Sequence, residues 1–187
     1  RTYSFWFLLV ASIPNSLIGT ALIFHQVDIF AAKGLSSTVS ASALSIMGPA
    51  SFAGIILGGI ATDRFPNRYL IALGQGLLVA AILLVVSLSQ IWQAIGYGLL
   101  LGFSMGFLMN VSTVIWPNYF GRKHIGSIKG IVSAVMVASA ALGPLPLSLG
   151  LDWAGSYEKV LLFSIAMPAV CAIAAYIAKP PLTEINH

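Results

Sequence analysis

One pair of side chains in this sequence has the types and the spacing to exchange a proton. His25 and Asp28 are three residues apart, which on a helix places them on the same face. A carboxylate at that distance favours the protonated form of an imidazole, so the pair is a candidate for proton coupling. The alternative is that both side chains meet water at the end of an apolar segment. His124 and His187 lie in a loop and near the chain end, so no second acid–base pair is offered and no enzyme is expected.

Amide and hydroxyl side chains interrupt the apolar segments at a few positions. Asn15 follows Pro14, Asn110 and Thr113 are three residues apart on one face, and Ser133 lies in a later segment. A polar group inside an apolar segment is costly and usually faces a cavity or another helix. These residues are therefore candidates for contact with a small ligand. For Asn15 and Asn110, a structural hydrogen bond between helices is the alternative.

The sequence shows no pattern typical of a metal or cofactor site. Cys171 is the only cysteine, which excludes an internal disulfide and a Cys-rich metal centre. No glycine-rich phosphate-binding loop follows a strand-like segment. We therefore expect no metal and no cofactor, and we expect no nucleic-acid partner.

The amino-acid composition does not fit a protein whose surface faces water. Charged residues make up 7% of the 187 residues and hydrophobic residues 58%, and the mean hydropathy is +0.95. Soluble domains carry about 25% charged residues. The composition therefore predicts an integral membrane protein whose partner is the lipid bilayer. Because the sequence begins with Arg1 and not with methionine, we also expect it to be part of a longer chain.

Apolar runs long enough to cross a bilayer occur six times along the sequence, since a spanning helix needs roughly 20 residues. Lipid offers the backbone no hydrogen-bond partners, so each spanning run must be helical. The sequence thus predicts an all-α integral membrane protein with six transmembrane helices, at about residues 4–30, 38–62, 69–89, 92–118, 125–151 and 157–178.

Glycines recur at every fourth position in two of these runs. Gly54 and Gly58 lie in the second run, and Gly98, Gly102 and Gly106 lie in the fourth. Stripes of small residues let helices approach closely, so we expect tight helix contacts there. Prolines within or near the runs remove backbone hydrogen bonds and permit kinks, at Pro14, Pro49, Pro117, Pro144, Pro146 and Pro168.

Basic residues are distributed unequally between the two sides that six spans create. One side holds only Lys33 and Lys159. The side with both termini and the second and fourth loops holds Arg1, Arg64, Arg68, Arg122, Lys123, Lys129 and Lys179. Such an excess marks the cytoplasmic face, so both ends are predicted to be cytoplasmic. The basic loop with Arg122, Lys123 and Lys129 is interpreted as an anchor at anionic lipid.

The loop after the second predicted helix resembles a known family motif. Gly59, Asp63, Arg64 and Arg68 fit the pattern G-x-x-x-D-R-x-x-x-R, which is similar to the cytoplasmic loop motif of the major facilitator superfamily. Pro66 stands where that motif usually has a glycine. The resemblance implies that ion pairs and helix dipoles in this loop hold the cytoplasmic side in one conformation and release it in the other. Topological anchoring alone is the alternative.

A second stretch narrows the resemblance. Residues 119–157, YFGRKHIGSIKGIVSAVMVASAALGPLPLSLGLDWAGSY, look like helices eleven and twelve of the monocarboxylate porter and oxalate–formate exchanger branch. This resemblance implies that the chain is the C-terminal half, helices seven to twelve, of a twelve-helix plasma-membrane carrier. An N-terminal six-helix half would be its partner, and a 3+3 inverted repeat is expected within the half.

The resemblance also implies a function. A half of this kind belongs to a secondary transporter that moves a small solute by alternating access, with an organic anion such as a monocarboxylate as the expected substrate. Its first, second, fourth and fifth spans would line the cavity. Ser51 and Ile55 stand where this branch commonly places an acid and an arginine, so Ser51 joins the cavity candidates. A carrier of a neutral or cationic solute, such as a sugar or a drug, is the alternative, and a non-transporting six-helix scaffold is another.

Overall fold

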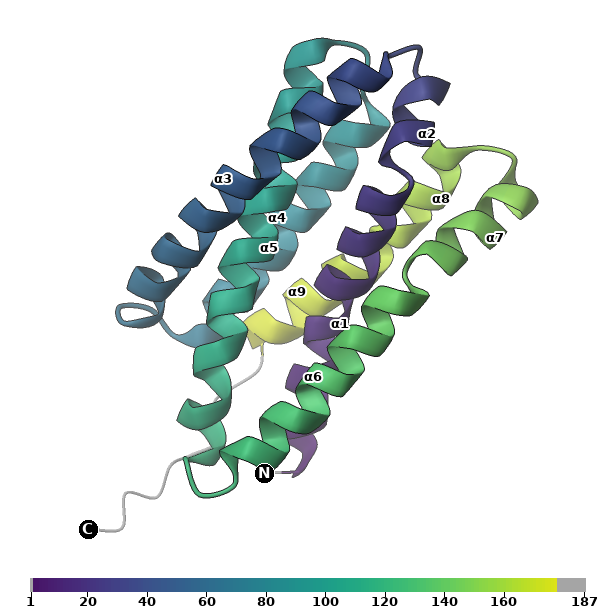
Figure 1. The fold of residues 1–187 in the computed structure, drawn as a ribbon. Coiled ribbons are helices and arrows are strands. Elements are labelled where there is room, and N and C mark those ends of the chain that lie inside the picture. The colour runs from purple at the N-terminus through teal and green to yellow at the C-terminus, as the bar shows by residue number, and fades with distance from the viewer. Residues whose placement is uncertain (1, 178–187) are drawn as a thin grey trace.

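The computed structural model describes residues 2–177, and every regular element within them is a helix (Figure 1). Six segments of these helices are long and apolar enough to cross a membrane. The prediction of an all-α protein with six candidate membrane spans is therefore confirmed. The elements are α1 (Thr2–Phe24), α2 (Gln26–Ala32), α3 (Ser37–Thr62), α4 (Asn67–Val86), α5 (Ile91–Phe120), α6 (Ile125–Leu142), α7 (Pro144–Ala154), α8 (Tyr157–Ser164) and α9 (Ala166–Ile177).

Three of the predicted spans are interrupted. The first is broken at His25, between α1 and α2, and the fifth at Gly143, where Pro144 begins α7. The sixth is broken at Ile165, three residues before Pro168. Proline cannot donate a backbone hydrogen bond, which explains why two of the breaks lie close to prolines. The predicted end of the sixth span, at residue 178, lies outside the described residues.

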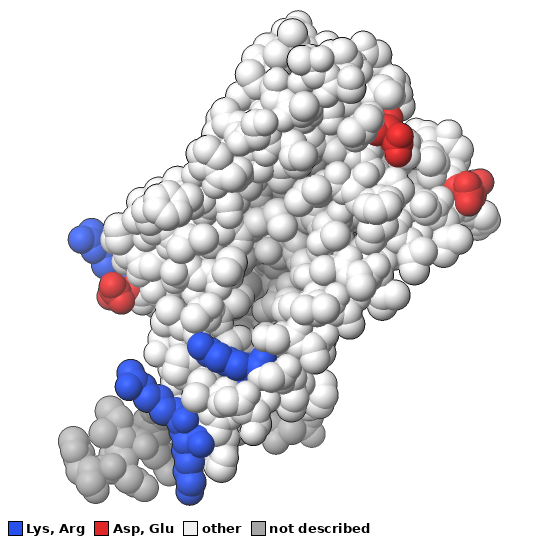
Figure 2. Space-filling view, in the orientation of Figure 1, with Lys and Arg blue, Asp and Glu red and all other residues white. Residues whose placement is uncertain are grey.

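The spans run alternately up and down through the bundle (Figure 1). The N-terminus, the α3–α4 loop and the α5–α6 loop lie at one end, and the α2–α3, α4–α5 and α7–α8 loops lie at the other. Figure 2 shows Lys and Arg side chains gathered toward the first of these ends. The predicted members Arg1 and Lys179 lie outside the described residues. Because the six spans alternate in direction, the two remaining basic loops, α3–α4 and α5–α6, lie at the same end of the bundle, as six spans require.

Helices α3 and α5 make the most extensive contact in the bundle. The three glycines of the α5 stripe face the backbone of α3, and a β-carbon at any of them would collide with a carbonyl oxygen there. Gly54 of α3 meets the backbone of α5 in the same way, and a β-carbon at Gly58 would lie 3.0 Å from the carbonyl oxygen of Phe107. The predicted close packing is confirmed, and it makes α3 and α5 a rigid pair.

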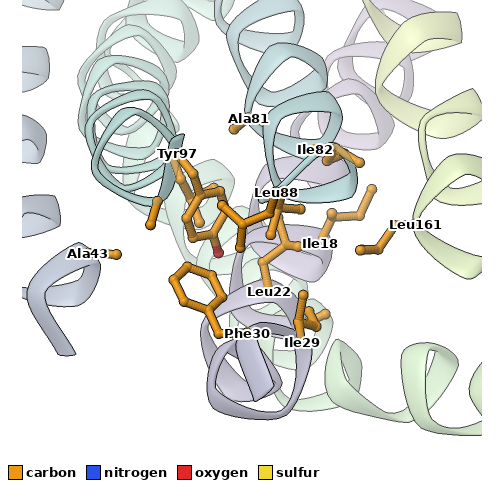
Figure 3. Close-up of a cluster of buried hydrophobic side chains, with 14 of the residues drawn as sticks. Ile18, Leu22, Ile29, Phe30, Ala43, Ala81, Ile82, Leu88, Tyr97 and Leu161 are labelled. Atoms are coloured by element: carbon orange, nitrogen blue, oxygen red, sulfur yellow. The ribbon is translucent and has the colours of Figure 1, made fainter. Parts of the chain in front are cut away.

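Two clusters of buried apolar side chains hold the spans together. In the cluster drawn in Figure 3, Phe30 and Tyr97 lie with their ring centroids 5.9 Å apart, and Leu161 reaches the same cluster from α8. The second cluster surrounds Trp116, whose ring centroid is 5.5 Å from that of Phe5. Helices α1, α4 and α5 contribute to both clusters and form the frame on which the polar residues are placed.

Candidate functional site: polar positions on α1, α3 and α5

The loop between α3 and α4 is short and held by backbone hydrogen bonds. The amides of Arg64 and Phe65 both donate to the Ala61 carbonyl oxygen, at 3.1 and 2.9 Å. Asp63 follows the last residue of α3, and its side chain is exposed. The C-terminal end of a helix carries a partial negative charge, so α3 does not stabilise this carboxylate. The Asp63 carboxylate is therefore accessible to any group that approaches this end of the bundle.

The predicted ion pairs of this loop are absent from the described structure. Arg64 is exposed, and Arg68 turns onto its neighbour Tyr69, with Nη2 donating to the phenol oxygen at 2.8 Å. The Arg68 Cζ atom also lies 4.6 Å from the centre of that ring. Its Nε is buried without a partner within the described residues. This conformation has no compact ion-pair network among the described residues of the loop, because Arg68 is oriented by an aromatic ring of its own helix. The gating role of the loop stays a prediction.

Asn110 lies against the end of α3 that leads into this loop. A β-carbon at Gly58 would be 3.4 Å from the Asn110 β-carbon, and one at Gly59 would be 3.6 Å from its amide nitrogen. The side chain of Asn110 is half-buried. The structure therefore brings together two predicted groups, a ligand candidate on α5 and the glycine of the loop motif on α3.

The hydroxyl candidates occupy different environments. Ser51 is half-buried within the α3–α5 contact, directly opposite Gly106. Thr113 is exposed, and its hydroxyl donates to the Met109 carbonyl oxygen at 2.9 Å in its own helix. Ser133 is exposed on α6. Within the described residues no hydrogen bond joins any two of the five ligand candidates, so they do not form a preassembled network.

Asn15 is the candidate with an unused buried polar atom. Its side chain is half-buried in α1, and its Oδ1 is buried with no hydrogen-bond partner in the described part of the chain. The next residue, Ser16, donates to the Met136 carbonyl oxygen of α6 at 2.8 Å, so α1 and α6 are joined at this level. An unsatisfied buried acceptor costs about 1–3 kcal/mol, and a bound donor would recover that cost.

His25 and Asp28 do not form the predicted pair. His25 is buried, and its Nε2 lies 3.1 Å from the Pro144 carbonyl oxygen of α7. A carbonyl oxygen only accepts, so Nε2 carries the hydrogen and donates it. Asp28 is exposed in the first turn of α2. His25 therefore links the breaks in the first and fifth spans, and the expected imidazole–carboxylate contact is replaced by a bond between helices.

Several polar contacts between spans were not anticipated from sequence. Fully buried Gln75 of α4 donates to the Ala11 carbonyl oxygen of α1 at 2.7 Å, and Gln26 donates to the Ser40 carbonyl oxygen at 2.7 Å. A lone glutamine in an apolar run is the available signal for such a contact. At the end opposite the basic loops, Lys33 forms an ion pair with Glu158.

Comparison with known families shows which family this chain belongs to. The sequence model described as Major Facilitator Superfamily matches residues 3–186. This chain belongs to the major facilitator superfamily. Membership of this superfamily, together with six apolar spans, supports a membrane-embedded secondary transporter of small solutes. Proteins of this superfamily are transporters and not enzymes. A search of curated proteins found no match to this chain.

Proposed function

We propose that this chain is the C-terminal half of a major facilitator carrier and moves an organic anion by alternating access. The solute would bind between this half and an N-terminal six-helix half, and both ends of this chain would face the cytoplasm at the plasma membrane. The observation that supports a site in this half is Asn15, whose Oδ1 is buried without a partner in the described residues. A buried acceptor in that state suits a ligand that brings a hydrogen-bond donor, such as the hydroxyl group of a hydroxy acid.

The proximity of Asn110 to the end of α3 supports a link between binding and gating. Asn110 lies against Gly58 and Gly59, and the loop with Asp63 begins four residues later. A solute that binds to Asn110 would therefore affect the position of α3, the helix that ends at this loop. In this proposal Asp63 and Arg68 find their partners in another conformation, or on the N-terminal half, because the described structure gives them no ion pair with each other.

The charge of the proposed site determines how an anion could bind. Charged residues in the described part of the chain lie near helix ends and in loops, while the middles of the spans carry amides and hydroxyls. A carboxylate in a membrane needs a cation or several donors. The amide groups of Asn15 and Asn110 would supply donors, and the cation would come from the N-terminal half. The same uncharged spans equally suit a neutral solute, which is the alternative.

Uptake by the full-length protein in proteoliposomes tests the proposal. We would supply labelled lactate, pyruvate, oxalate, a sugar and a cationic drug, each with and without an inward proton gradient. Acid uptake that the gradient raises would support the anion carrier. Accumulation of the sugar or the drug alone would replace it by the alternative, and no accumulation of any compound would favour a scaffold.

A matched pair of variants tests the site itself. Asn15→Ala should raise the KM for the accumulated solute by several-fold, because one hydrogen bond contributes about 0.5–1.5 kcal/mol. Asn118→Ala is the control, because Asn118 is exposed near the end of α5. An equal KM in both variants would remove Asn15 from the site.

A further inference from the structure

A cavity outside the proposed solute site opens between α1, α7 and the last span. Its volume is about 690 Å³, within the roughly 300–1,000 Å³ of sites that hold small molecules. Two close contacts bound it. Gly143, the residue before α7, lies against the Leu17 backbone of α1, and Gly150 of α7 lies against Val160 of α8. All three walls belong to candidate membrane spans, so the cavity lies at membrane depth.

The lining of this cavity is almost entirely apolar. Leu22 and Leu147 form part of its buried wall, and Met167 belongs to the wall from α9. Two aromatic side chains at the lining are highly exposed, Trp153 at 96% and Phe163 at 82%. An exposed tryptophan at the end of a span, as Trp153 is, is typical of the boundary between lipid tails and headgroups, whereas Phe163 lies within the sixth span and faces the lipid tails. An occupant should therefore be a hydrocarbon chain that enters from the surrounding lipid.

One cation completes the lining. Lys159, in the first turn of α8, is exposed and belongs to the cavity wall. Within residues 2–177 its one hydrogen bond is a long one, 3.5 Å from Nζ to the Ala154 carbonyl oxygen. The neighbouring Glu158 is engaged by Lys33, so it does not neutralise Lys159. Asp152 is exposed and is not part of the lining. The cavity thus pairs a long apolar wall with a positive charge at its mouth.

We infer that this cavity binds one anionic phospholipid, with an acyl chain between α1, α7 and α9 and its phosphate at Lys159. The apolar wall fits a hydrocarbon chain, and an ammonium group at the level of the headgroups attracts a phosphate. In the proposed topology Lys159 lies on the side opposite the cytoplasm, so the bound lipid belongs to that leaflet. This lipid is distinct from the transported solute, because the cavity lies behind α1 and contains none of the five ligand candidates. It would brace the broken fifth and sixth spans against each other.

Crosslinking to the full-length protein in nanodiscs locates the lipid. The probe is phosphatidylglycerol with a diazirine near the end of one acyl chain, mixed with excess phosphatidylcholine. Peptide mapping should find the label on α7 and α9, including Leu147 or Met167. Label spread evenly over exposed residues of α3 and α6 would mean that only the general lipid shell was sampled, and it would overturn the proposal.

Native mass spectrometry of variants measures the two parts of the site separately. In nanodiscs of equal phosphatidylglycerol and phosphatidylcholine, Lys159→Gln should reduce the retained ratio of the two lipids by about fivefold. Lys129→Gln, near the start of α6 at the opposite end of the bundle, measures the effect of losing one ordinary surface charge, and the loss in Lys159→Gln should exceed it. Ala166→Phe, at an exposed lining position, should reduce retention of both lipids by filling the cavity.

The outcomes separate lipid binding from loss of folding. Each variant is first compared with the wild type by thermal unfolding, and Ala154→Phe replaces Ala166→Phe if the latter unfolds early. A wild-type lipid ratio in Lys159→Gln would overturn the role of Lys159. Unchanged retention in both cavity-filling variants would show that the cavity holds something else, such as a solute or a helix of another protein.

Discussion

Asn110 of α5 stands directly beside Gly59 of α3, with its amide nitrogen 3.6 Å from the point where a Gly59 β-carbon would lie. Because α3 and α5 are locked together by glycines along their length, this contact cannot loosen without moving the whole pair. We therefore predict that a change at Asn110 affects the end of α3 and the loop that carries Asp63.

Replacing Asn110 by alanine should raise the KM for the transported solute by up to about tenfold, if the amide contributes one hydrogen bond to binding. The measurement is concentration-dependent uptake in proteoliposomes, with Asn118→Ala as the control. A KM equal to that of the wild type, together with an earlier thermal transition, would assign Asn110 to packing against α3 alone.

Replacing Asp63 by asparagine should slow transport at least about fivefold while the amount of protein in the membrane stays the same. Couplings between two conformations are typically worth 1–3 kcal/mol, which sets this scale. Asp152→Asn, an exposed acid at the opposite end, is the control. Wild-type rates in Asp63→Asn would reduce the loop to a topological anchor.

We predict that the effect of a glycine-to-alanine substitution depends strongly on whether the glycine lies in the contact between α3 and α5. Gly102→Ala should destabilise the protein by about 1–3 kcal/mol, because its β-carbon would collide with the Met47 backbone. Gly76→Ala is the matched control, since nothing lies within 4 Å of a β-carbon there, and alanine is the better helix former. Equal unfolding temperatures for the two variants in detergent would show that α3 and α5 can separate at little cost.

Lys33 makes two contacts that should contribute unequally to stability, and a double-mutant cycle can measure the contribution of the pair with Glu158. Lys33 bonds both Glu158 and the Val86 carbonyl oxygen, the latter at 2.6 Å. The side chains of the pair are 18% and 55% exposed, so the coupling between them should be only about 0.2–1 kcal/mol. Lys33→Met should cost more than Glu158→Gln, because it also leaves the end of α4 without its donor. Equal costs in thermal unfolding would contradict the role of the Val86 contact.

His25 should stabilise the protein through its hydrogen bond to Pro144. His25→Leu should cost about 0.5–1.5 kcal/mol, since the part-buried Pro144 carbonyl oxygen loses its donor, and His25→Gln should recover part of that cost. Thermal unfolding of the wild type and of both variants measures the two differences. Equal losses in His25→Gln and His25→Leu would show that a donor to the Pro144 carbonyl oxygen contributes nothing.

Features that depend on a single span could be predicted from sequence, and features that depend on how spans meet could not. The six runs and the glycine stripes are readable because hydropathy and fourfold spacing are local properties. The meeting of Asn110 with Gly59 depends on the register of α5 against α3, which no local pattern encodes. Lys33 and Glu158 are 125 residues apart, so the sequence around either residue does not indicate their contact.

Local reasoning was also wrong where a side chain had a better distant or aromatic partner. The spacing of His25 and Asp28 suggested a pair, but His25 reaches a carbonyl oxygen 119 residues away. Ion pairs were expected within the loop from Asp63 to Arg68, yet Arg68 lies over Tyr69. In both cases sequence spacing identified residues with a polar role and misassigned the atoms they contact.

The three helix breaks are not spread evenly over the bundle. They interrupt the spans built from α1–α2, α6–α7 and α8–α9, whereas α3, α4 and α5 are continuous rods of 26, 20 and 30 residues. The described part of the chain therefore has one side of uninterrupted helices and one side of interrupted helices. Because a helix bends most readily where its regular turns are interrupted, we expect hinge motion at His25, Gly143 and Ile165.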